Sequence, residues 1–64
     1  MAKKKVIVEG CGENLYYVAE SSGTYYAYKG RVWSSDVQIG KARSMSDALA
    51  IITSYSGRAI ESIG

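Results

Sequence analysis

Residues 15–29 read LYYVAESSGTYYAYK, and this stretch decides the fold. Two runs rich in tyrosine, valine and alanine flank Ser21-Ser22-Gly23, a combination that is typical of a tight turn. Tyrosine and valine favour β-strands because their side chains pack well on a pleated surface. The stretch therefore predicts a β-hairpin with strands over 15–20 and 24–29.

Each of the two strands contains a pair of neighbouring tyrosines, Tyr16-Tyr17 in the first and Tyr25-Tyr26 in the second. Successive side chains of a strand point to opposite faces of the sheet. Each pair must therefore be divided between the two faces, whatever the register of the hairpin.

The register decides which tyrosine lies on which face. A two-residue turn at 22–23 pairs Tyr17 with Tyr28, whereas a three-residue loop over 21–23 pairs Tyr16 with Tyr28. We favour the three-residue loop, because it requires a positive φ only at its glycine.

The segments on either side of the hairpin continue the strand pattern. Residues 4–9 precede it and contain three β-branched residues in succession, and Val37-Gln38-Ile39 follows it. The connections are too short for parallel crossovers, so all strands must be antiparallel. This predicts a three- to four-stranded antiparallel β-meander.

From Ser44 onward the spacing of the apolar residues changes from that of a strand to that of a helix. Apolar side chains at 45, 48, 49, 52 and 55 fall on one side of a 3.6-residue repeat. Ser44 or Ser46 can cap the start of this helix, and Gly57 is suited to its end. The tail over 58–64 fits either a helical turn or a short edge strand.

These elements predict an α+β fold, a single β-β-β-(β)-α domain over 1–64 with one C-terminal helix packed on one face of the sheet. The residues expected in the core are Val6, Val8, Leu15, Val18, Tyr26, Val37, Ile39, Leu49, Ile52 and Tyr55.

Composition and the N-terminus limit the function classes. The chain has 64 residues, 47% of them hydrophobic, and a formal net charge of +2, which is too small to require a nucleic-acid partner. The apolar run after Lys3-Lys4-Lys5 is too short for a signal peptide, and no run could span a membrane. We expect a soluble, cytoplasmic protein whose three lysines either begin a strand or form a phosphate-attracting arm.

Residues for catalysis and metal binding are scarce. The chain has no histidine and a single cysteine, Cys11, which lies between two glycines and is expected in a loop. Nucleophilic triads and ordinary zinc sites need residues that this chain lacks. The sequence therefore predicts a protein that is not an enzyme and that binds neither a metal nor a cofactor.

A single helix covers one face of a sheet, so the other face keeps at least two large aromatic side chains. Self-association through this face or through a strand edge is our first interpretation and makes the protein a homo-oligomeric interaction module. The alternative is binding of single-stranded nucleic acid. A third reading leaves the tyrosine rings flat on the sheet with their hydroxyls in water.

The candidate residues follow from these interpretations. The interaction surface is expected among Tyr16, Tyr17, Tyr25, Tyr26, Tyr28 and Trp33, with candidate phosphate contacts at Lys29, Arg31, Lys41 and Arg43.

Overall fold

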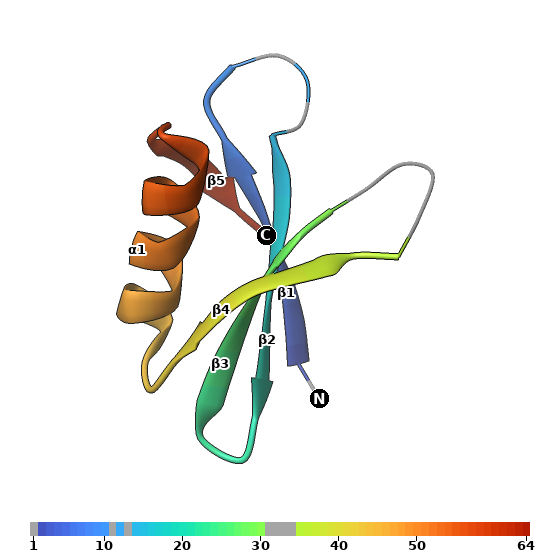
Figure 1. Ribbon diagram of the computed structural model, residues 1–64, viewed down its shortest axis with the longest axis vertical. Helices are drawn as coiled ribbons and strands as arrows, with labels where there is room; N and C mark the ends of the chain where they lie inside the picture. The colour runs from blue at the N-terminus through green and yellow to red at the C-terminus, as the bar shows by residue number, and fades with distance from the viewer. Residues whose placement is uncertain (1, 11, 13, 31–34) are drawn as a thin grey trace.

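The computed structural model describes residues 2–10, 12, 14–30 and 35–64. They form a single antiparallel sheet with one helix against it (Figure 1). In chain order the elements are β1 (Ala2–Val8), β2 (Leu15–Ser21), β3 (Thr24–Lys29), β4 (Val37–Ala42), α1 (Met45–Ser56) and β5 (Ile60–Ile63). The strand order β4-β3-β2-β1-β5 confirms the α+β class and the meander of the first four strands.

The predicted number of strands was too small by one, because the tail forms a fifth strand after the helix, the edge-strand alternative for this segment. β5 pairs antiparallel with β1, placing Val6 opposite Ile63 and Val8 opposite Ile60. The register shifts between these pairs, so that Glu61 is an extra residue on β5. This bulge puts two isoleucines that are three residues apart on the same face of the sheet, and their spacing therefore resembled that of a helix.

The hairpin of β2 and β3 has the register that we did not favour. Tyr17 lies opposite Tyr28 and Ser21 opposite Thr24, so the turn has two residues. Both turn residues have a positive φ, 51° at Ser22 and 79° at Gly23. Such a turn matches the right-handed twist of the strands, and this benefit outweighs the cost of about 1–2 kcal/mol for a left-handed serine.

The helix begins and ends where the sequence predicts. The hydroxyl of Ser44 accepts a hydrogen bond from the Asp47 amide at 3.2 Å. Gly57 has a φ of 70°, and its amide donates to the Thr53 carbonyl at 2.9 Å. These caps satisfy backbone groups that would otherwise have no partner at the helix ends.

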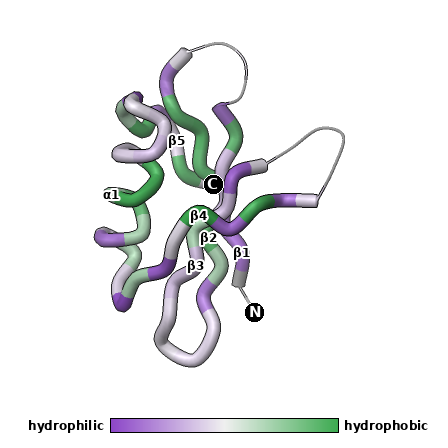
Figure 2. The backbone as a smooth tube through the Cα atoms, in the orientation of Figure 1, coloured by the Kyte–Doolittle hydropathy of each residue, from purple (hydrophilic) through white to green (hydrophobic). Residues whose placement is uncertain are grey.

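The helix packs on one face of the sheet, as predicted, and lies closest to β4 and β3. Gly40 of β4 permits this close approach, since a Cβ atom there would lie 3.0 Å from Cγ2 of Ile51. Figure 2 shows hydrophobic residues in the middle of α1 and in the part of β1 that enters the core. The buried core consists of Val6, Val8, Tyr16, Val18, Ala27, Ala48 and Ile52.

Four of the predicted core residues are buried: Val6, Val8, Val18 and Ile52. Ile39 and Leu49 are partly buried against this core.

The other four predicted core residues are not in this core. Leu15 and Tyr26 are half-buried on the face away from the helix. Tyr26 lies there because the register differs from the one we favoured, and Leu15 because it is three residues from the buried Val18 on the same strand. Val37 is 42% exposed at the start of an edge strand, and Tyr55 is 55% exposed in the last turn of the helix. Tyr16, which the sequence did not place in the core, is only 2% exposed.

Candidate functional site

The face of the sheet opposite the helix carries three tyrosines. Tyr17, Tyr26 and Tyr28 lie on this face, whereas Tyr16 and Tyr25 lie on the helix side. The prediction that each tyrosine pair is divided between the two faces is therefore confirmed.

Two rows of paired residues run across this face. One row contains Lys5, Tyr17, Tyr28 and Gln38, and the other contains Lys3, Ala19, Tyr26 and Lys41. Residues paired across neighbouring strands point to the same face, so all of these side chains share one surface. We call this surface the lysine–tyrosine face.

A bulge in β4 helps to build the lysine–tyrosine face. The register between β3 and β4 shifts between Ala27 and Tyr28, which leaves Ile39 as an extra residue. Gln38 and Lys41, three residues apart, therefore both lie on the face away from the helix. A bulge also bends its strand and increases the local twist.

The tyrosines on this face are half-buried. Ala19, which lies between them in the second row, is only 3% exposed although the helix packs on the other side of the sheet. Side chains other than those of the helix therefore cover this part of the face, and the tyrosines on it are themselves partly shielded from water.

The charge on this face is mainly positive. Lys3 and Lys5 flank the tyrosines from β1, Lys41 flanks them from β4, and all three are exposed. No acidic residue occurs among the paired residues of the two rows, and Asp36, which directly precedes β4, brings one carboxylate to Lys3. The small net charge of the chain thus conceals a basic surface.

Lys3 makes two contacts over this face. Its Nζ lies 4.5 Å from the ring centroid of Tyr17 and 3.1 Å from Oδ2 of Asp36. Asp36 directly precedes β4, which is three strands away from β1 in the sheet order. The start of β4 must therefore curve back over the sheet, as its crossing in front of β1 and β2 in Figure 1 illustrates.

The structure does not bring all the predicted site residues together. Tyr16 and Tyr25 belong to the helix side, where Tyr16 packs edge-to-face on Tyr55 with centroids 6.3 Å apart. Arg31 and Trp33 lie outside the described residues.

The predicted phosphate contacts are also dispersed. Lys41 lies on the lysine–tyrosine face, Arg43 is exposed in the connection between β4 and α1, and Lys29 is on the helix side. Lys3 and Lys5 also lie on the lysine–tyrosine face, and sequence reasoning considered them only as the start of a strand or as a phosphate-attracting arm. Their alternate positions in β1 were the available signal, because alternate residues of a strand share a face.

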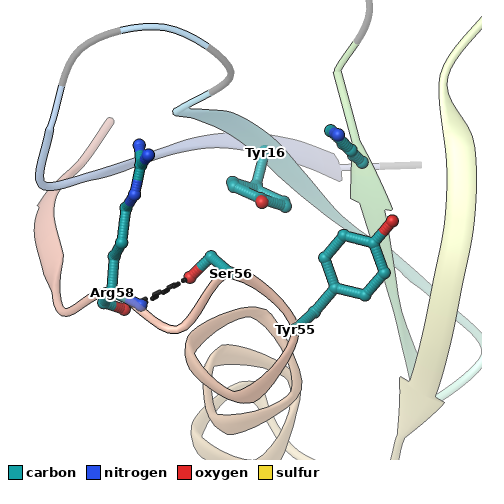
Figure 3. A pocket seen from close by; sticks show the side chains of 5 residues that line it. Tyr16, Tyr55, Ser56 and Arg58 are labelled. Atoms are coloured by element: carbon teal, nitrogen blue, oxygen red, sulfur yellow. Dashed lines mark hydrogen bonds between the residues drawn. The ribbon is translucent and has the colours of Figure 1, made fainter.

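A second feature lies on the helix side, at the C-terminal end of α1. It is a depression of about 170 Å³ lined by Tyr16, Lys29, Tyr55, Ser56 and Arg58. Figure 3 shows it from close by, with Tyr16, Tyr55, Ser56 and Arg58 labelled.

Contacts within the protein account for the cations at this depression. Nη1 of Arg58 donates to the carbonyls of Gly12 and Glu9 at 3.2 and 3.4 Å. Lys29 Nζ lies 5.9 Å from the ring centroid of Tyr55. Arg58 thus connects the segment after α1 to the segment between β1 and β2, and Lys29 contacts the last turn of α1 through the ring of Tyr55.

No other kind of site emerges from the described residues. They contain no group of three or more side chains that could hold a metal ion. No helix in the described part of the chain is long and apolar enough to span a membrane. Comparison of the chain with protein-family models, curated proteins and solved structures finds no match.

Proposed function

We propose that this protein is a non-enzymatic module that binds single-stranded nucleic acid on its lysine–tyrosine face. The observation that carries the proposal is the grouping of Tyr17, Tyr26 and Tyr28, with lysines on both sides of them. Aromatic rings that lie on a sheet offer stacking surfaces for bases, and lysines beside them attract phosphates.

The spacing of the tyrosines favours an extended single strand. Tyr26 and Tyr28 are two residues apart on β3, a distance of roughly 7 Å along a strand. Tyr17 lies opposite Tyr28 on β2, roughly 5 Å away. Bases stacked on one another are only about 3.4 Å apart, so each ring is better matched to a separate, unstacked base. In a duplex the faces of the bases are not accessible.

The lysines supply a salt-dependent contribution to the proposed binding. Each phosphate neutralised by a lysine releases counterions, and for single strands the logarithm of affinity falls by about 0.7 per contact per tenfold rise in salt. We expect three such contacts, at Lys3, Lys5 and Lys41. They correspond to about a hundredfold loss of affinity between about 20 and about 200 mM salt.

Fluorescence anisotropy with a labelled thymidine decamer tests this proposal. We expect the single strand to bind at low salt, to weaken by about two orders of magnitude over a tenfold rise in salt, and to bind more tightly than the matching duplex. Absence of binding at low salt, or an affinity that salt does not change, would contradict it.

Self-association is a second candidate, supported by the two edges of the sheet. Val37 on β4 and Ile63 on β5 are 42% and 46% exposed, and edge strands present backbone groups that can pair with another chain. The lysine–tyrosine face suits this role less well, because two copies of it would repel each other. Sedimentation of the protein alone separates the candidates: a monomer at high concentration removes this one. Both candidates are consistent with the cytoplasmic location that we expect.

A further inference from the structure

The ammonium group of Lys3 lies over the ring of Tyr17, and this ring is one of the surfaces on which the proposed function places a base. The ammonium lies 4.5 Å from the Tyr17 centroid. A base that stacks on this side of the ring must displace the ammonium. Tyr17 therefore differs from Tyr26 and Tyr28, which have no such cation contact among the described residues.

Asp36, which directly precedes the edge strand β4, holds Lys3 of β1 in this position. The two side chains form an ion pair at 3.1 Å with exposed fractions of 51% for Lys3 and 26% for Asp36. Exposed ion pairs and exposed cation–π contacts are each weak, so the arrangement is easily opened. A phosphate offers Lys3 an equivalent negative partner.

We propose that Lys3 exchanges Asp36 for a phosphate when nucleic acid binds, and that Asp36 thereby weakens binding as a competitor for the lysine. The inference rests on the proposed function and adds to it a mechanism that sets affinity. The exchange is a change of partner that leaves Lys3 protonated throughout, and it exposes the Tyr17 ring to a base.

Asp36→Asn tests the exchange with the thymidine decamer at low salt. Removing the competing carboxylate is expected to tighten binding by about threefold to fivefold, the equivalent of one exposed ion pair. Glu61→Gln is the matched control, because it removes the same charge from the bulge of β5 and should change the affinity by less than about twofold.

A double-mutant cycle with Lys3→Gln shows whether Asp36 acts through Lys3. We expect Lys3→Gln to weaken binding. When Lys3→Gln is present, Asp36→Asn should change the logarithm of the affinity by at most about half as much as it does in the unmodified protein. An equal effect in both backgrounds would mean that Asp36 acts only by repelling phosphates, and would overturn the exchange.

NMR gives a readout that is independent of affinity. Above the Tyr17 ring, the ε-methylene protons of Lys3 should be shifted upfield in the free protein, and this shift should disappear when the decamer saturates the protein. Retention of the upfield shift at saturation would overturn the inference.

The failures of the two proposals are distinguishable. If the unmodified protein binds the decamer but Asp36→Asn binds no tighter, the exchange is wrong and the proposed function stands. If neither protein binds, the proposed function is wrong and this inference falls with it.

Discussion

Replacing Tyr28 with alanine is expected to weaken binding of a single-stranded decamer by about tenfold to a hundredfold. Tyr28 lies in the centre of the lysine–tyrosine face, between Tyr17 on β2 and Gln38 on β4. Loss of one base–aromatic stack costs about 1–3 kcal/mol, which gives this range of affinities. Anisotropy titrations at one fixed low salt concentration measure the change.

Two variants control this experiment. Tyr28→Phe keeps the ring and should bind within about threefold of the unmodified protein, because stacking needs no hydroxyl. Tyr55→Ala removes a tyrosine that is 55% exposed on the helix side and should leave the affinity unchanged. Circular dichroism confirms that each variant is folded. A folded Tyr28→Ala protein with full affinity would show that Tyr28 does not stack with a base.

The largest expected effect on stability is that of Ile52→Ala. Ile52 is fully buried in α1, where it belongs to the core cluster that includes Val18 and Ala27. Truncating a buried isoleucine costs about 2–5 kcal/mol, and a domain of this size rarely has more than about 3–5 kcal/mol in total. We therefore expect this variant to be largely unfolded at room temperature, as measured by urea titration with circular dichroism.

Thr53→Ala is the matched control, because Thr53 is the exposed neighbour of Ile52 on the same helix. Its hydroxyl donates to the Leu49 carbonyl, an interaction within the helix, and alanine is the better helix former. The change in unfolding free energy should stay within about 0.5 kcal/mol. An Ile52→Ala protein with an unchanged urea midpoint would contradict the packing of α1 on the sheet.

Much of the fold could be predicted from local patterns. The runs of tyrosine, valine and alanine around Ser21-Ser22-Gly23 identified the central hairpin, and strand geometry divides each tyrosine pair between two faces in any register. The helix was predicted together with its caps, since Ser44 and Gly57 supply the hydrogen bonds and the backbone conformation that helix ends require.

The errors arose where a local preference competed with the rest of the sheet. A positive φ at Ser22 is unfavourable by itself and is accepted because the two-residue turn fits the twist of β2 and β3. The bulges at Ile39 and Glu61 each add a residue to one strand, so residues three apart share a face. Periodicity cannot reveal such bulges, because they depend on the partner strand.

The candidate site was only partly predictable for a related reason. The sequence indicated that tyrosines would remain on the face away from the helix, but their identity depended on the register. The contact between Lys3 and Asp36 joins residues 33 positions apart and depends on the curvature of β4. The charge of the lysine–tyrosine face likewise appears only when β1 and β4 are placed around the central tyrosines.

Chemical-shift mapping with an isotope-labelled protein and the thymidine decamer tests the central claim most directly. We predict that the largest shift changes fall on the strands of the lysine–tyrosine face, at Lys5, Tyr17, Tyr26, Tyr28 and Lys41, while the amides of α1 change little. Changes centred on α1 or on the outer edge of β5, or no change with excess decamer at low salt, would contradict the account.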